Sequence, residues 1–239
     1  MRMLLSSVLA IVLVIPCSAS EIKTQKNILY PPSSSVIIQE EFASGTTASG
    51  NIGSNGFGVT AGTLTGIASI SNRPGIYRLD TTAVLGTVAQ IFLYSGSSEA
   101  IQSTVPHEIV WITRLNNNDA DTTVRIGGMN SVATNPPNNG IYFEKLTADT
   151  NWFCIARIGG VETRTDSGVA VNINFTTFLY LRNSSGVQYK INNVNVCGTI
   201  STNLPSALVV PAVQIVNSAA ASKTIDMDYF QIKYTGITR

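Results

Sequence analysis

Short apolar runs rich in Val, Ile and Thr recur along most of this chain, and clusters of Gly, Asn, Ser and Pro separate them. The runs are about four to eight residues long, which is a strand length rather than a helix length. In 187–191 the odd positions are apolar and the even positions are polar, so one face of that segment is solvated. The pattern predicts an all-β, antiparallel, two-sheet β-sandwich.

The predicted strands are bounded by residue types that favour turns. Hairpin-type turns are expected at 116–119, 138–140 and 183–186, because Asn and Gly tolerate positive φ. Residues 43–66, rich in Gly, Ser and Thr, are expected to form a long surface loop with one or two weak edge strands. The strands are expected at 36–42, 75–79, 88–94, 108–115, 122–126, 141–145, 152–157, 161–164, 178–182, 187–191, 208–216 and 225–234.

The first twenty residues differ from the rest. Arg2 precedes an unbroken apolar run over 8–15, Pro16 interrupts it, and 18–20 offer small residues for cleavage. This layout is typical of a secretory signal peptide, and the run is too short for a spanning helix, which needs about 20 apolar residues. An uncleaved anchor is the alternative, whereas Pro16 makes Cys17 a poor fit to a lipoprotein site.

The domain organisation follows from this division. Residues 1–20 are interpreted as the signal peptide, 21–35 as a polar leader or linker, and 36–239 as one sandwich domain. We therefore expect a secreted, extracellular or surface-displayed protein with no membrane span after cleavage. The chain has 15 basic and 14 acidic residues, so a nucleic-acid partner is not expected.

Two cysteines remain in the mature chain. Cys154 and Cys197 could pair, because disulfides persist in exported proteins. The alternative is two separate, partly buried thiols, since the sequence does not supply the distance between them.

Strand parity suggests a candidate binding surface. If the even-numbered apolar residues of 108–115 face the core, then Trp111 faces outward. The same reasoning places Arg125 and the pair Tyr142 and Glu144 on outer faces. On neighbouring strands these four side chains would form a carbohydrate-binding floor, because aromatic rings stack on sugar rings and charged groups hydrogen-bond to hydroxyls. The alternative is that Trp111 is buried.

A series of short motifs in fixed order gives this pattern a family resemblance. They are PGIYRL at 74–79, NGIYFE at 139–144, NW at 151–152, GGVET at 159–163, DSGVAV at 166–171, INNVNV at 191–196, TNLP at 202–205 and DMDY at 226–229. From residue 36 to residue 234 the chain resembles the concanavalin A-like lectin/glucanase superfamily, in the form seen in phage tail and virion surface proteins. The resemblance implies a jelly roll of two curved sheets whose concave face is the usual ligand site, and it does not specify an activity.

Signals for catalysis and for metal binding are weak. The acidic Glu-x-Asp-x-Glu strand that places two carboxylates together in glycosidases of this fold does not occur, and Asp226-x-Asp228 is interpreted as structural. His107 with Tyr142 or Tyr180 could serve as the base of a lyase, although an exposed strand-end histidine is the simpler interpretation. No cofactor is expected. The weak calcium candidates, in an oxygen-rich loop, are Asn118, Asp119 and Asp121.

Three functions remain as hypotheses. The leading one is a non-catalytic, lectin-like carbohydrate-binding module that binds glycan on its concave sheet. The second is a structural or adhesion module of a virion or cell surface, which could form a homo-oligomer or pack against partner chains. The third is a divergent polysaccharide lyase or glycoside hydrolase.

Overall fold

The computed structural model describes residues 35–42, 57–60, 63–67, 73, 75–93, 101–116, 120–130 and 135–235. In this part of the chain the regular secondary structure consists of β-strands, which form two antiparallel sheets. The whole predicted signal peptide and residues 21–34 of the predicted leader lie outside the described residues, and Ser35, the last leader residue, begins β1. Within the described residues no helix has the length and apolarity needed to cross a membrane.

The first sheet, called sheet A here, has eight strands. Its order is β14 (Val194–Ile200), β13 (Gly186–Ile191), β12 (Thr176–Asn183), β7 (His107–Leu115), β16 (Thr224–Thr235), β4 (Ile76–Asp80) and β3 (Thr63–Ile67), and β1 (Ser35–Glu40) also pairs with β16.

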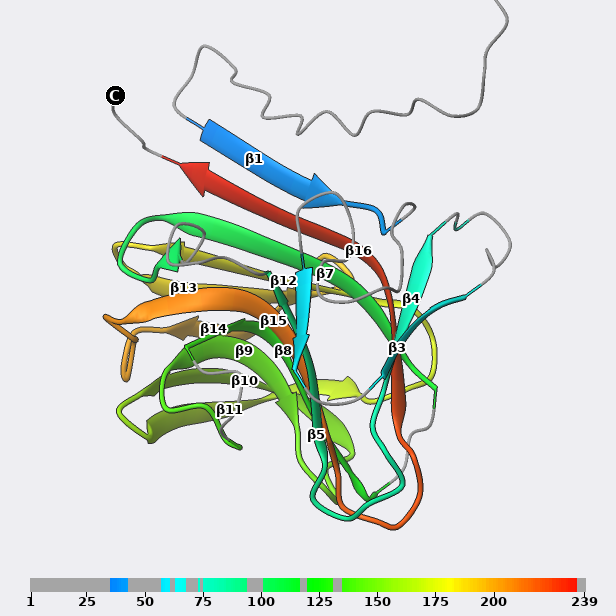
Figure 1. The fold of residues 1–239 in the computed structure, drawn as a ribbon. Coiled ribbons are helices and arrows are strands. Elements are labelled where there is room, and N and C mark those ends of the chain that lie inside the picture. The colour runs from blue at the N-terminus through cyan, green and yellow to red at the C-terminus, as the bar shows by residue number, and fades with distance from the viewer. Residues whose placement is uncertain are drawn as a thin grey trace, which may run out of the picture.

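The second sheet, sheet B, also has eight strands. Its order is β11 (Val161–Ala170), β10 (Asn151–Ile158), β9 (Gly140–Lys145), β8 (Thr122–Met129), β15 (Leu208–Asn217), β5 (Val88–Leu93) and β2 (Phe57–Thr60), and β6 (Ile101–Gln102) also pairs with β15. Figure 1 shows both sheets bowed in the same sense, with sheet B on the inner side of the curve. The outer face of sheet B is therefore the concave face of the molecule. The all-β, antiparallel two-sheet sandwich is confirmed.

The main hydrophobic core lies between the sheets and is rich in aromatic rings. Trp111 of β7 is 4.7 Å from Phe230 and 5.9 Å from Phe57, measured between ring centroids. Phe178 of β12 packs against Phe143 of β9 at 5.1 Å, so rings from both sheets interlock. Burial of such large side chains is the main favourable term in a fold of this kind.

The structure contains strands that the sequence pattern did not indicate. The short β6 and the whole of β14 were not predicted, and β11 extends to Ala170 instead of ending near 164. Between β13 and β14, Asn192 and Asn193 both have positive φ, 49° and 65°. That conformation forms the two-residue turn typical of hairpins, so the Asn pair joins β13 to β14 in the same sheet.

Candidate functional site

A row of polar side chains crosses the concave face of sheet B. The strand register places Arg125 of β8 beside Glu144 of β9 and Gln214 of β15, and Gln214 lies opposite Gln90 of β5. Arg125 donates from Nε to Glu144 Oε2 at 2.8 Å and from Nη1 to Gln214 Oε1 at 2.8 Å. Gln214 then donates to Gln90 Oε1 at 3.2 Å. Hydrogen bonds thus link four strands in one continuous row.

Asn135, which lies between β8 and β9 in the chain, contacts this row. Asn135 Oδ1 accepts a hydrogen bond of 2.7 Å from Arg125 Nη1, although Arg125 lies four residues before the end of β8 at Met129. The Arg125 and Glu144 side chains are only 3% and 2% exposed. They form a buried ion pair on an outer sheet face, with Asn135 bonded to the arginine.

A small second hydrophobic cluster lies on the same face. It contains Met129, Tyr142, Ile155 and Ala212, with Phe92 and Phe153 packed against it. The Tyr142 ring lies back over Gly140, because a Cβ added there would be 2.7 Å from Tyr142 Cδ1. Burial raises the pKa of Tyr142 well above its usual value, and its hydroxyl has no hydrogen-bond partner among the described residues. Tyr142 therefore packs as a core residue.

Toward β10 and β11 the concave face becomes accessible. Arg164 of β11 donates from Nε to Glu144 Oε1 at 3.2 Å and from Nη2 to Asp149, and its Cζ lies 3.4 Å from the centroid of the Phe153 ring. The Arg164 side chain is nevertheless 23% exposed. Its Nη1 makes no hydrogen bond to a described residue. The guanidinium is therefore held by three contacts and still has N–H donors that those contacts do not use.

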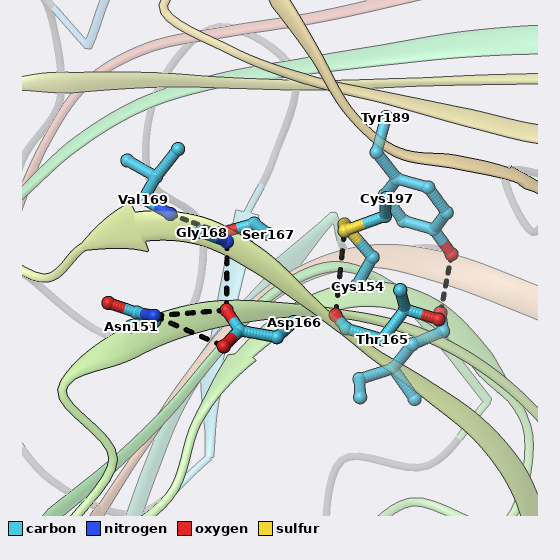
Figure 2. The surroundings of a disulfide bond; sticks show 10 residues. Asn151, Cys154, Thr165, Asp166, Ser167, Gly168, Val169, Tyr189 and Cys197 are labelled. Atoms are coloured by element: carbon cyan, nitrogen blue, oxygen red, sulfur yellow. Dashed lines mark hydrogen bonds between the residues drawn. A yellow bond between two sulfur atoms is a disulfide. The ribbon is translucent and has the colours of Figure 1, made fainter.

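An acidic group lies next to this arginine. Asp166 of β11 accepts hydrogen bonds of 3.1 Å from Asn151 Nδ2 at each carboxylate oxygen and one of 2.8 Å from the Gly168 amide (Figure 2). The Gly168 bond, with smaller contributions from Asn151 and Arg164, lowers the pKa of Asp166. Asp166 is exposed and ionised at neutral pH. We call Asn151, Phe153, Arg164 and Asp166 the β10–β11 rim.

A disulfide closes the adjacent edge of the sandwich. Cys154 of β10 and Cys197 of β14 are bonded, so one covalent link joins sheet B to sheet A (Figure 2). Cys197 lies in a bulge of β14 with positive φ, where the register with β13 shifts between Gln188 and Tyr189. Bulges redirect side chains, and this one turns the Cys197 sulfur toward β10. Of the two alternatives for these cysteines, the structure has the pairing.

The Tyr189 hydroxyl reinforces the same edge. It donates a hydrogen bond of 2.6 Å to the carbonyl oxygen of Ile155, which crosses from sheet A to sheet B (Figure 2). Tyr189 is fully buried and its pKa is raised well above the usual value by burial, so the hydroxyl stays protonated as a donor. The β10–β11 rim is thus attached to a firmly connected edge.

The predicted binding floor is only partly assembled. Arg125, Tyr142 and Glu144 share the concave face as predicted, but all three are buried instead of exposed. The prediction for Trp111 was wrong: it lies in sheet A, is 1% exposed and faces the core. In β7 both the odd and the even positions include apolar residues, so alternation alone did not identify which face is turned to the core. Glu108 and Arg114, which share the parity of Val110 and Ile112, were the signal for the outer face.

Sequence reasoning also missed the β10–β11 rim. The charged residues Glu162, Arg164 and Asp166 occupy alternate positions of β11. This period-2 charge pattern was the available sign of a solvated sheet face. At the end of the rim, Glu162 pairs with Arg157.

His107 is buried, so the expectation of an exposed strand-end histidine was wrong. Its Nδ1 lies 2.7 Å from the Val105 carbonyl oxygen and must carry the proton, while Nε2 accepts from the Tyr180 hydroxyl at 3.2 Å. Burial, opposed by the Val105 bond and helped by Arg182, lowers the pKa of His107 to about 4. Both rings are inside the sandwich, where a polysaccharide would not reach them.

The remaining candidates have structural surroundings. Asp226 forms ion pairs with Arg78 and Arg114, and Asp228 pairs with Arg73. Asn118 and Asp119 lie outside the described residues, and Asp121 is exposed. In the described part of the chain no group of three or more His, Cys, Asp or Glu side chains could hold a metal ion.

Comparison with solved structures identifies the fold. A protein of unknown function from Shewanella oneidensis MR-1 has a TM-score of 0.62 at 10% identity, covering 87% of this chain and 90% of its own. The Emp47p carbohydrate recognition domain has a TM-score of 0.57 at 10% identity, covering 83% of this chain and 95% of its own. A beta-1,3-glucanase from Mycobacterium marinum has a TM-score of 0.56 at 10% identity, covering 82% and 97%.

No protein-family model matches the sequence, and no curated protein matches it. The structural likeness therefore concerns the fold. The described chain has the concanavalin A-like jelly-roll fold that the ordered sequence motifs predicted.

Proposed function

We propose that this protein is a non-catalytic carbohydrate-binding module and that its ligand binds at the β10–β11 rim of the concave face. The observation that best supports the proposal is that Arg164 is held in place and still partly exposed. Glu144, Asp149 and Phe153 fix its guanidinium, yet the side chain remains partly exposed with Nη1 free of described partners. A donor fixed before binding loses little conformational entropy when it binds a hydroxyl.

The rim combines the groups that sugar recognition requires. Arg164 supplies donors, Asp166 supplies acceptors, and the Phe153 ring with its stacked guanidinium supplies a flat surface. The likeness to a carbohydrate recognition domain supports carbohydrate binding by a chain of this fold, although the glucanase with the same fold shows that the fold also hosts catalysis.

The charge arrangement favours binding over hydrolysis. A glycosidase needs a carboxylic acid that donates a proton and a second carboxylate. On this face Glu144 accepts from two arginines, Asp149 pairs with Arg164, and Glu162 pairs with Arg157. Each of these carboxylates is already engaged by a guanidinium group, so they do not form the facing acid and nucleophile pair of a glycosidase.

We also propose that the protein is exported or displayed on a surface. The disulfide between Cys154 and Cys197 supports this, because such bonds form and persist in oxidising compartments. The signal-peptide pattern of residues 1–20 supports the same location.

The test is a titration of the folded protein with a panel of neutral and acidic oligosaccharides. We expect a dissociation constant in the micromolar to millimolar range for at least one saccharide. Arg164→Gln should weaken binding about tenfold or more, because it removes a charge-assisted donor. Lys190→Gln, on the outer face of sheet A, is the matched control and should bind as the original protein does.

Three results would overturn the proposal. They are the absence of saccharide binding, equal affinity of the Arg164→Gln and original proteins, and release of shortened or unsaturated products. Absence of binding together with a stable oligomer would favour a structural or adhesion module, and product release would favour a lyase or glycosidase.

A further inference from the structure

A second group of charged side chains gathers on the outer face of sheet A, away from the concave face. Three arginines, two aspartates and one phenylalanine from separate strands and loops meet there, and we call them the convex cluster. Its members are Arg73, Arg78, Arg114, Phe175, Asp226 and Asp228.

Asp226 of β16 is the buried centre of the convex cluster. It accepts from Arg78 Nε at 2.7 Å and Nη2 at 3.1 Å, from Arg114 Nε at 3.2 Å, and from Asn116 Nδ2 at 2.9 Å. Burial raises the pKa of Asp226, but the bonds from Arg78, Arg114 and Asn116 outweigh it and leave the pKa lowered. Asp226 is thus a fixed negative charge that orients two guanidinium groups.

A bulge in β16 adds the second aspartate. The register with β7 shifts between Met227 and Tyr229, so Asp228 is the extra residue of the bulge, and it pairs with Arg73. The Phe175 ring lies under two of the guanidinium groups, 4.3 Å from Arg73 Cζ and 4.8 Å from Arg114 Cζ. Stacking on a ring holds a guanidinium plane while leaving its N–H edge available.

The arginines of the convex cluster keep N–H donors that bond to no described residue. The cluster itself has three arginines and two aspartates, and Asp80 of β4 adds a further negative charge near Arg78. The Arg73, Arg78 and Arg114 side chains are 35%, 34% and 23% exposed. Nη1 of Arg78 and Arg114, and Nε and Nη2 of Arg73, make no hydrogen bond to any described residue.

We propose that the convex cluster is a binding site for a tetrahedral oxyanion, the sulfate or phosphate ester group of a small molecule or saccharide. Donors that bond to no described residue, on three separate guanidinium groups, match an anion with three or more acceptor oxygens. A planar carboxylate has two oxygens, and one arginine can satisfy both. The site is independent of the β10–β11 rim, which lies on the other sheet.

The test measures binding of sodium sulfate at low ionic strength by calorimetry, with sodium chloride at matched ionic strength as the reference. Arg73→Gln should weaken sulfate binding about tenfold, because it removes donors and one charge. Asp228→Asn should strengthen it, because it frees Arg73 and raises the local charge. Neither change touches Asp226, so the buried centre of the cluster is kept.

Matched variants separate this site from the rest of the molecule. Lys190→Gln removes a charge elsewhere on sheet A, and Asp166→Asn removes one on sheet B; both should leave sulfate binding unchanged. No sulfate binding, or equal effects of Arg73→Gln and Lys190→Gln, would overturn the proposal. Acetate binding as tight as sulfate would overturn the tetrahedral assignment. Phe153→Ala should leave sulfate binding intact whether or not the rim binds saccharide.

A further pair of probes identifies the source of the oxyanion. Tighter binding of a sulfated than of an unsulfated disaccharide would assign a sulfated glycan, and tighter binding of a sugar phosphate would assign a phosphate ester. If neither the sulfated disaccharide nor the sugar phosphate binds more tightly than the corresponding unmodified sugar, the proposed oxyanion site would be contradicted.

Discussion

Each sheet of this sandwich has one buried carboxylate held by two arginines, and the two groups differ in what surrounds them. On the concave face of sheet B, Glu144 binds Arg125, which is itself buried and bonded to Gln214 and Asn135. On the convex face of sheet A, Asp226 binds Arg78 and Arg114, which both reach solvent.

The difference shows that burial determines whether such an ion pair serves the fold or is available to a ligand. A buried arginine that is bonded to three neighbouring side chains is committed to the fold, and removal of its acidic partner leaves an uncompensated charge in a medium of low dielectric. A partly exposed arginine regains water when its partner is lost, and its free N–H groups are available to a ligand. Arg164 combines the two conditions, because it joins the buried network and still reaches solvent.

The largest effect should come from breaking the concave ion pair. Glu144→Ala is expected to cost about 3–5 kcal/mol of unfolding free energy, because Arg125 would remain buried without a counter-charge. Urea denaturation measures it. A loss as small as that of a surface substitution would show that Arg125 is not confined as described.

Removal of the disulfide should have the next largest effect. Cys154→Ser with Cys197→Ser is expected to lower the unfolding free energy by roughly 3–4 kcal/mol in the chain-entropy model. Because Cys154 adjoins Phe153, amide exchange should rise in β10 and β11 more than in β4 and β16. Uniform exchange changes across both sheets would argue against a local attachment of the rim.

Acidification should weaken the fold through His107, which lies apart from both carboxylate groups. Its pKa is about 4 in the folded protein and 6.5 in the unfolded chain, so the unfolded state binds more protons between these values. The stability linked to neutral His107 is therefore fully present above pH 6.5. It falls by at most about 3 kcal/mol as the pH drops toward 4.

The control for this prediction is His107→Asn, which should flatten the dependence of stability on pH over that interval. Burial is the main cause of the shift; the Val105 carbonyl opposes it, Arg182 adds to it, and the Tyr180 hydroxyl bonds to the ring. An unchanged slope in the variant would assign the acid sensitivity to other groups.

The smallest effect should come from the convex cluster. Asp226→Asn is expected to cost about 1–2 kcal/mol, less than Glu144→Ala, because Arg78 and Arg114 can turn toward water. Thermal unfolding of the two variants side by side compares them. A reversed order would contradict the division of roles between the faces.

Much of the architecture followed from the sequence because strand alternation is a local property. The parity of 123–126 and 141–144 correctly placed Val124 and Phe143 in the core, and Arg125 and Glu144 on the outer face. The turn at 183–186 is stabilised as Asn-containing turns are, with Asn183 Oδ1 accepting from the Gly186 amide.

The accessibility of the site did not follow from the sequence, because it depends on contacts between distant segments. Asn135 contacts Arg125 from outside the sheet, and Arg164 of β11 reaches Glu144 of β9 across the intervening strand β10. A parity argument assigns a face and carries no information about what lies over it. The prediction for Trp111 was wrong for a related reason. Its strand, β7, has apolar residues at both odd and even positions, so alternation does not show which set faces the core.

The pairing of the cysteines was also beyond the sequence. It depends on the positive φ of Cys197, which turns its side chain out of the regular alternation of β14 and toward β10. No spacing rule between Cys154 and Cys197 encodes that local conformation.

The most direct test of carbohydrate binding at the β10–β11 rim is an amide chemical-shift titration with the tightest-binding oligosaccharide of the panel. We predict that the perturbed amides cluster in β10 and β11, around Phe153, Arg164 and Asp166. Perturbations confined to the outer face of sheet A, or no saturable change at any saccharide concentration, would contradict the assignment of the site.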